Sequence, residues 1–135
     1  MGGTAMRPEG VTVADQKTIL AIDRNPRNLE LLHAFLAKHG YHVEVAATLE
    51  AVDLALSGCC ISLGLVDIAG FDRGIWKQCE RMRVAGIPFL VIFPQQQAAV
   101  REESYGHGAH GTLTKPLMQK QLLGIIGGLL GREAE

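Results

Sequence analysis

The chain has 135 residues, of which 47% are hydrophobic, 20% charged and 5% aromatic, and its formal net charge is −1. A chain of this length corresponds to one domain, and it buries about two-thirds of its unfolded surface without needing a disulfide or a metal ion. The high apolar content excludes a disordered chain, and the balanced charge gives no support for a nucleic-acid partner.

The two ends of the chain lack hydrophobic periodicity. Residues 1–16 are rich in glycine and predict a disordered tail, residues 17–131 predict the folded domain, and residues 132–135 predict a second short tail. The first stretch lacks the basic start and apolar run of a signal peptide. The longest apolar run, 122–130, is about half the ~20 residues that a membrane-spanning helix needs. We therefore expect a cytoplasmic protein with no membrane contact.

Short apolar runs alternate with segments of helical periodicity along the chain. The predicted strands are 18–22, 41–45, 60–66, 88–93 and 111–113. The predicted helices extend from an Asn25 cap to Gly40, from a Thr48 cap to Gly58, and over 74–85, 96–105 and 118–130.

Five strand-then-helix units predict an α/β domain with a parallel sheet and helices on both faces. In such a sheet, ligands bind outside the carboxyl ends of the strands. The residues that follow the predicted strands include Asp23, Asp67, Phe93 and Lys115. Two acids and a lysine at one edge of the sheet are therefore the candidates for chemistry.

Four segments in order resemble a response-regulator receiver domain, over about residues 17–130. They are ILAIDRNPRN, LGLVD, IPFLVIF and GAHGTLTKPL, of which the Lys-Pro segment is the most specific. The resemblance implies a flavodoxin-like (βα)₅ fold with a five-stranded parallel sheet in the order 2-1-3-4-5. It also implies a role in a two-component phosphorelay, in which a kinase histidine passes a phosphoryl group to an aspartate.

The resemblance also assigns roles to individual residues. Asp67 stands at the phosphoacceptor position and Lys115 at the position of the lysine that pairs with the phosphate. Asp23 matches the first of two paired acids that, with Asp67, hold Mg²⁺. Pro116 matches a proline that follows a cis peptide bond.

Three positions depart from the receiver pattern. Arg24 replaces the second acid, Phe93 replaces the Ser or Thr that bonds the phosphoryl group, and Thr112 replaces the switch aromatic. Arg24 has three alternatives: it points into the site, pairs with Asp67, or turns to solvent. Pointing inward, it would repel each unit of positive charge on the metal ion by roughly 3 kcal/mol at about 5 Å. We expect weakened or absent Mg²⁺ binding. Phe93 either fills the mouth of the site or continues the buried strand.

The sequence thus favours a non-enzymatic interaction module of a phosphorelay with an atypical phosphorylation site. Its expected partners are a histidine kinase, a phosphotransfer protein or a downstream signalling protein. One alternative is a competent receiver that is phosphorylated on Asp67 with Mg²⁺. The other is a flavodoxin-like nucleotide- or flavin-binding domain. The sequence has no phosphate-binding loop after the first predicted strand, which argues against this second alternative.

Two further patterns carry weaker predictions. The G-x-G-x-x-G match at 106–111 leads into a predicted strand instead of opening a helix, so it does not indicate a dinucleotide site. His107 and His110 within it are expected to be surface residues. The glycines of 124–131 allow close approach of another backbone, which favours a homodimer through the fourth and fifth helices and the fifth strand.

Overall fold

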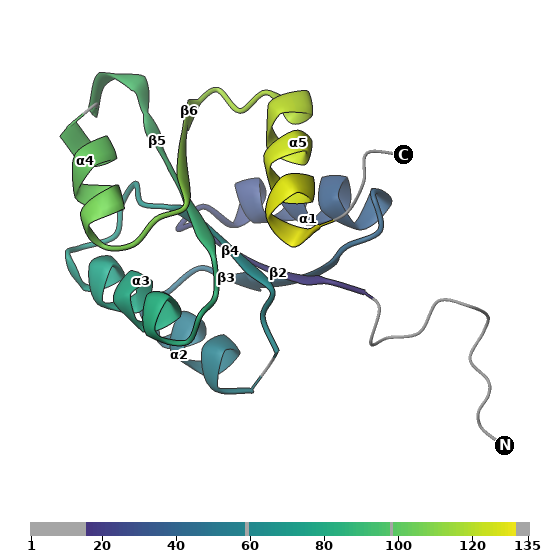
Figure 1. Cartoon of the computed structure of the whole chain (residues 1–135), viewed down its shortest axis with the longest axis horizontal. Helices are drawn as coiled ribbons and strands as arrows, with labels where there is room; N and C mark the ends of the chain where they lie inside the picture. The colour runs from purple at the N-terminus through teal and green to yellow at the C-terminus, as the bar shows by residue number, and fades with distance from the viewer. Residues whose placement is uncertain (1–15, 59, 98, 132–135) are drawn as a thin grey trace, which may run out of the picture.

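The computed structural model describes residues 16–58, 60–97 and 99–131. Five parallel strands form one sheet in the order β3-β2-β4-β5-β6 (Figure 1). The strands are β2 (Thr18–Ile22), β3 (His42–Ala46), β4 (Leu63–Asp67), β5 (Phe89–Pro94) and β6 (Gly111–Lys115). Numbered by their order in the chain, they have the order 2-1-3-4-5, which confirms the predicted topology.

Helices cover both faces of the sheet, as Figure 1 shows. They are α1 (Pro26–Lys38), α2 (Leu49–Gly58), α3 (Gly74–Val84), α4 (Ala99–Gly106) and α5 (Gln119–Leu130). One buried cluster joins the sheet to α1 and α5, and the other joins it to α2, α3 and α4. This doubly wound packing explains why β4 and the first five residues of β5 are buried on both faces.

The start of α1 follows the predicted capping pattern. The Asn25 side chain accepts hydrogen bonds from the backbone N–H groups of Arg27 and Asn28, at 2.9 and 3.4 Å. Pro26 occupies the first turn, where its missing N–H costs no hydrogen bond. The cap fixes the direction in which the chain leaves β2, and therefore where Asp23 lies.

Three predicted boundaries are wrong. The strand predicted from residue 60 begins only at Leu63, because Ser62 still lies in the bend that precedes the strand. The helix predicted from residue 96 begins at Ala99, because residues 95–97 form a short 3₁₀ helix, η3. The strand predicted to end at residue 113 continues to Lys115, because residues 114 and 115 pair with the last two residues of β5.

Phe93 lies in β5 and is fully buried. It belongs to the cluster that β5 forms with α2, α3 and α4. Of the two alternatives for this side chain, the structure supports the continuation of the buried strand. Thr112 pairs with Val91 in the neighbouring strand and is half-buried.

The predicted tails, apart from Gln16, lie outside the described residues, as does Cys59. Within the described ranges, none of the helices has the length and apolar composition that crossing a membrane requires.

Candidate functional site

Asp67 and Lys115 form an ion pair at the carboxyl edge of the sheet. The Lys115 Nζ atom lies 2.8 Å from Asp67 Oδ2, and the backbone N–H of Ala69 donates to Asp67 Oδ1 at 3.1 Å. The Asp67 residue is 5% exposed, whereas the Lys115 side chain is 34% exposed. Because β4 and β6 end at the same edge with β5 between them, two residues 48 positions apart meet there.

Asp23 lies beside this pair, directly after β2. Its carboxylate accepts hydrogen bonds from the Asn25 backbone N–H at 2.9 Å and from Asn28 Nδ2 at 3.3 Å. Burial raises the pKa of Asp23 above its ordinary value, and the nearby Asp67 charge raises it further, while the Asn25 N–H acts in the opposite direction. Asp23 is therefore a carboxylate whose negative charge is incompletely compensated.

Arg24 is exposed, and its side chain lies against the loop that follows β4. Its guanidinium carbon lies 5.7 Å from the centre of the Phe71 ring, within the range of a cation–π contact. The loop passes close to the arginine stem at Gly70, which has a φ of +84°. A Cβ atom there would lie 3.3 Å from Arg24 Cγ. Of the three alternatives for Arg24, the structure supports the side chain turned outward.

Asp23 and Asp67 are the candidate metal ligands at this edge of the sheet. Among the described residues, no group of three or more His, Cys, Asp or Glu side chains is arranged to hold a metal ion. Mg²⁺ is typically held by one or two carboxylates together with waters and phosphate oxygens. Here only Asp23 and Asp67 supply carboxylates, and Lys115 already neutralises the second. The described donors at this edge are therefore two carboxylates, one of them already paired with an ammonium group.

The remaining predicted positions lie as follows. Pro116 follows a cis peptide bond, as predicted, and it lines the same cavity as Asp67 and Lys115. The cavity lining does not include Phe93 or Thr112. The cavity therefore brings together four of the seven predicted residues, and Arg24 lies outside it with the other two.

Sequence reasoning missed Asn28 and Phe71. Asn28 lies in the first turn of α1, five residues after Asp23, so the predicted start of that helix offered a signal for it. Phe71 offered none, because its contact with Arg24 depends on the path of an irregular loop.

No protein-family model matches the sequence, and no curated protein matches it. Solved structures match closely in fold. A two-component response regulator from Clostridium difficile has a TM-score of 0.79 at 22% identity, covering 89% of this chain and 100% of that one. A CheY-like receiver domain protein from Methanospirillum hungatei has a TM-score of 0.75 at 25% identity, covering 86% and 94%. This chain therefore has the fold of a response-regulator receiver domain.

A third structure, a receiver protein from Burkholderia phymatum, has a TM-score of 0.80 at 17% identity and covers 88% of this chain and 98% of that one. Receiver domains are signalling modules of two-component systems, and they typically bind Mg²⁺ at their phosphorylation site. In this chain, the carboxyl edge of the sheet holds the Asp67–Lys115 pair with Asp23 beside it.

Proposed function

We propose that this receiver domain acts as a cytoplasmic protein-interaction module of a phosphorelay and that its phosphorylation site at Asp67 is atypical. The observation that carries the proposal is the Asp67–Lys115 ion pair at the carboxyl edge of the sheet. A carboxylate beside a lysine is suited to accept a phosphoryl group, because the ammonium group stabilises negative charge that develops on the phosphoryl oxygens.

Three departures support the atypical character of the site. Arg24 replaces an acid, so Mg²⁺ loses a ligand, and its guanidinium contacts Phe71. Phe93 is buried in the core and has no hydroxyl to bond a phosphoryl oxygen. Thr112 takes the place of an aromatic side chain. We infer that Mg²⁺ binds weakly. We also infer that a phosphoryl group on Asp67 would find no hydroxyl at position 93, so it would not draw the loop after β5 towards the site.

A competent receiver is the second candidate, and the position of Arg24 favours it. Arg24 contacts Phe71, and the ionic partner of Asp67 is Lys115. The arginine therefore does not block the phosphoacceptor carboxylate by pairing with it. A phosphodonor, whether a histidine kinase or a phosphotransfer protein, would then still reach Asp67.

Incubation with Mg²⁺ and either acetyl phosphate or beryllofluoride distinguishes the two candidates. The atypical site predicts no stable adduct on Asp67 at ordinary reagent concentrations, measured by intact mass and amide NMR. A stoichiometric adduct that is absent from Asp67→Asn would establish the competent receiver instead.

The Arg24→Asp variant tests the cause of weak metal binding. Restoring the acid should raise Mg²⁺ affinity at least about tenfold, because a repulsive charge is replaced by an attractive one. Arg27→Asp is the matched control, since the Arg27 side chain is 71% exposed and pairs with Glu30 on α1. Equal gains in the two variants would show that the effect is only a general change in net charge.

We also propose a homodimer through α4, β6 and α5. Gly124 and Gly128 are exposed on α5, and a Cβ atom at either position would meet no heavy atom within 4 Å, so packing inside the domain does not require glycine there. Sedimentation velocity of wild type and Gly128→Leu tests this. The wild type should sediment as a dimer and the variant as a monomer; a monomeric wild type would refute the proposal.

A further inference from the structure

A cavity of about 340 Å³ opens between α1 and α5, beside the Asp67–Lys115 pair. Most of its wall is apolar and comes from α1, α5 and the sheet. The main apolar lining residues are Leu31, Leu32, Phe35, Leu65, Ile92 and Leu122. Small-molecule sites in proteins have this volume and this mixture of an apolar wall with a few convergent polar groups.

The polar end of the cavity carries excess negative charge. Asp23, Asp67 and Lys115 line it, and two carboxylates with one ammonium group leave a formal charge of −1. Arg24 does not line the cavity and lies over Phe71 instead. Asp23 accepts hydrogen bonds from two uncharged groups, the Asn25 N–H and the Asn28 amide, and its charged neighbour Asp67 carries the same sign of charge.

We propose that this cavity binds a small amphipathic amine, with its ammonium group at Asp23 and its apolar body between α1 and α5. An anionic ligand would be repelled by the excess negative charge, and a neutral one would leave Asp23 without an ionic partner. A compact hydrated metal ion would use the polar end but leave the apolar wall unfilled. An organic cation satisfies both ends of the cavity. The assignment does not depend on whether Asp67 is phosphorylated.

Three probes that share an indole ring test the charge requirement. Tryptamine is a cation, tryptophol is its neutral counterpart with the same two-carbon chain, and indole-3-acetate is an anion. We expect tryptamine to bind with a Kd of about 1 mM or tighter and at least about tenfold more tightly than tryptophol, because hydrogen bonds to charged groups are the stronger ones. Indole-3-acetate should bind more weakly still. Methyl NMR should show the shifts at Leu32, Leu65 and Leu122.

Two variants locate the two ends of the ligand. Asp23→Asn should reduce the affinity for tryptamine to that for tryptophol, while leaving tryptophol unchanged. Leu32→Phe should fill the cavity and weaken both amine and alcohol, whereas Leu54→Phe, at an exposed position on α2, should weaken neither. Equal affinities of the three probes for wild type, or methyl shifts outside the cavity, would overturn the proposal.

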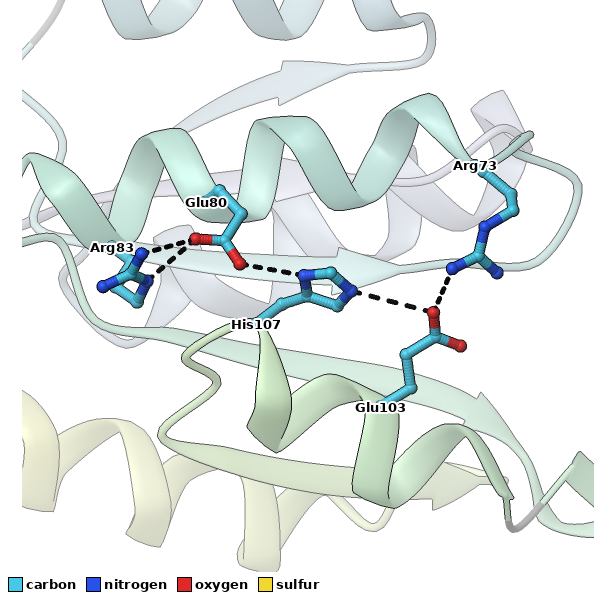
Figure 2. A network of polar contacts seen from close by, with 5 residues as sticks. All are labelled: Arg73, Glu80, Arg83, Glu103 and His107. Carbon is cyan, nitrogen blue, oxygen red and sulfur yellow. Dashed lines mark hydrogen bonds and ion pairs between the residues drawn. The ribbon is translucent and has the colours of Figure 1, made fainter.

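A second and independent feature joins α4 to α3 through His107 (Figure 2). His107 Nδ1 lies 2.9 Å from Glu80 Oε2 on α3, and His107 Nε2 lies 3.7 Å from Glu103 Oε2 on α4. Arg83 pairs with Glu80, and Arg73 pairs with Glu103, so each carboxylate also has a guanidinium partner. The His107 side chain is 28% exposed, so it lies at the surface, with a carboxylate facing each of its ring nitrogens.

The imidazole ring is held on its face as well as at its edges. It stacks on Trp76 of α3, with ring centres 4.8 Å apart and an angle of 15° between the planes. A neutral imidazole has one N–H and one lone pair, so one of its nitrogens would present a lone pair to a carboxylate. The imidazolium form presents an N–H to both, and it also gains a cation–π contact with Trp76.

We propose that His107 is a proton-dependent latch that holds α4 against α3. Its charged neighbours on α3 are Glu80 and Arg83. The other two are Arg73, which directly precedes α3, and Glu103 on α4 (Figure 2). The hydrogen bond from His107, and then that from Arg83, hold the pKa of Glu80 below its usual range, which favours the ionised carboxylate beside the imidazole. α4 has only eight residues, and Ser104 is its one buried residue among those described, so its position depends strongly on such contacts.

Trp76 is the only tryptophan, which makes its emission a direct report on His107. Emission should rise in one sigmoid between pH 5 and 8, because a stacked imidazolium quenches indole more than neutral imidazole does. Hydrogen-exchange protection of α4, normalised to α1, should fall about three- to fivefold over the same range. His107→Gln should abolish both changes.

His42→Gln is the matched control, because His42 pairs with Glu44 at 2.8 Å on β3, far along the chain from α4. It should leave both pH dependences intact. If Trp76 emission titrates while α4 protection stays constant, His107 only stacks and the latch is refuted. If neither changes with pH, the charged form of His107 is absent and the proposal also fails.

Discussion

The ion pair between Lys115 and Asp67 should contribute measurably to stability. At 2.8 Å and an effective dielectric constant near 20, two unit charges attract by about 6 kcal/mol. Removing one partner of a fully buried pair costs about 3–5 kcal/mol, and exposed pairs contribute about 0–1 kcal/mol. Because Asp67 is 5% exposed and the Lys115 side chain 34%, this pair falls between those limits, and we expect a coupling energy of about 2 kcal/mol.

A double-mutant cycle measures this coupling. Lys115→Met removes the ionic partner of the Asp67 carboxylate. That carboxylate keeps its hydrogen bond from the Ala69 N–H and its like-charged neighbour Asp23. The variant should therefore destabilise the domain by about 3 kcal/mol at pH 7. The double variant with Asp67→Asn removes both charges and should recover most of that loss. Urea unfolding followed by far-UV circular dichroism gives the four free energies of unfolding.

The exposed pair of Arg27 and Glu30 is the control for this cycle. Its nitrogen–oxygen distance is 3.0 Å, similar to that of the site pair, but both side chains are 71% exposed. We expect a coupling below about 0.5 kcal/mol there. If the coupling of Lys115 and Asp67 is equally small, solvent screens the site pair fully, and the reasoning from burial is refuted.

Three further variants test the capping, packing and electrostatics of the domain. Asn25→Ala should lower the free energy of unfolding by about 1 kcal/mol, because two N–H groups of α1 lose their acceptor; urea unfolding checks this. Gly64→Ala should cost about 1–3 kcal/mol, since the added Cβ would lie 2.6 Å from Met82 Sδ; calorimetry would contradict this if the melting temperature is unchanged. Asp23→Asn should raise stability at pH 7 and lose that gain at pH 3. The raised pKa of Asp23 means that its charged form is less favourable in the folded state than in the unfolded state. Below the ordinary pKa of 3.8, the wild-type carboxyl is protonated in both states, so the advantage of asparagine disappears. A gain that persists at pH 3 would contradict the electrostatic cause.

The fold was predictable from the sequence because local and long-range signals agree. The uninterrupted apolar residues of β5 predict a strand buried on both faces, and Asn25 with Pro26 predicts the start of α1. The boundaries that failed depend on tertiary contacts. β6 extends to Lys115 only because β5 extends to Pro94 beside it, and no local pattern in Thr114 and Lys115 specifies that pairing.

The site was predictable in part for the same reason. Strand ends in a parallel sheet converge, so the proximity of Asp23, Asp67 and Lys115 follows from topology alone. The direction of a long exposed side chain does not follow from topology, and Arg24 illustrates this. The His107 cluster was also beyond sequence reasoning, since the carboxylate partners of His107 come from α3 and α4, and Glu80 lies 27 residues away.

The position of Arg24 changes the charge of the site. Counted from the sequence, two aspartates face an arginine and a lysine, which gives a formal zero. In the structure, Arg24 lies over Phe71, and the cavity retains only Asp23, Asp67 and Lys115, which gives −1. A site with this charge still attracts a cation, although it lacks the third carboxylate that would favour a divalent metal. Loss of one acid therefore changes which cation the site favours, and an apolar wall beside the remaining carboxylates favours an organic one.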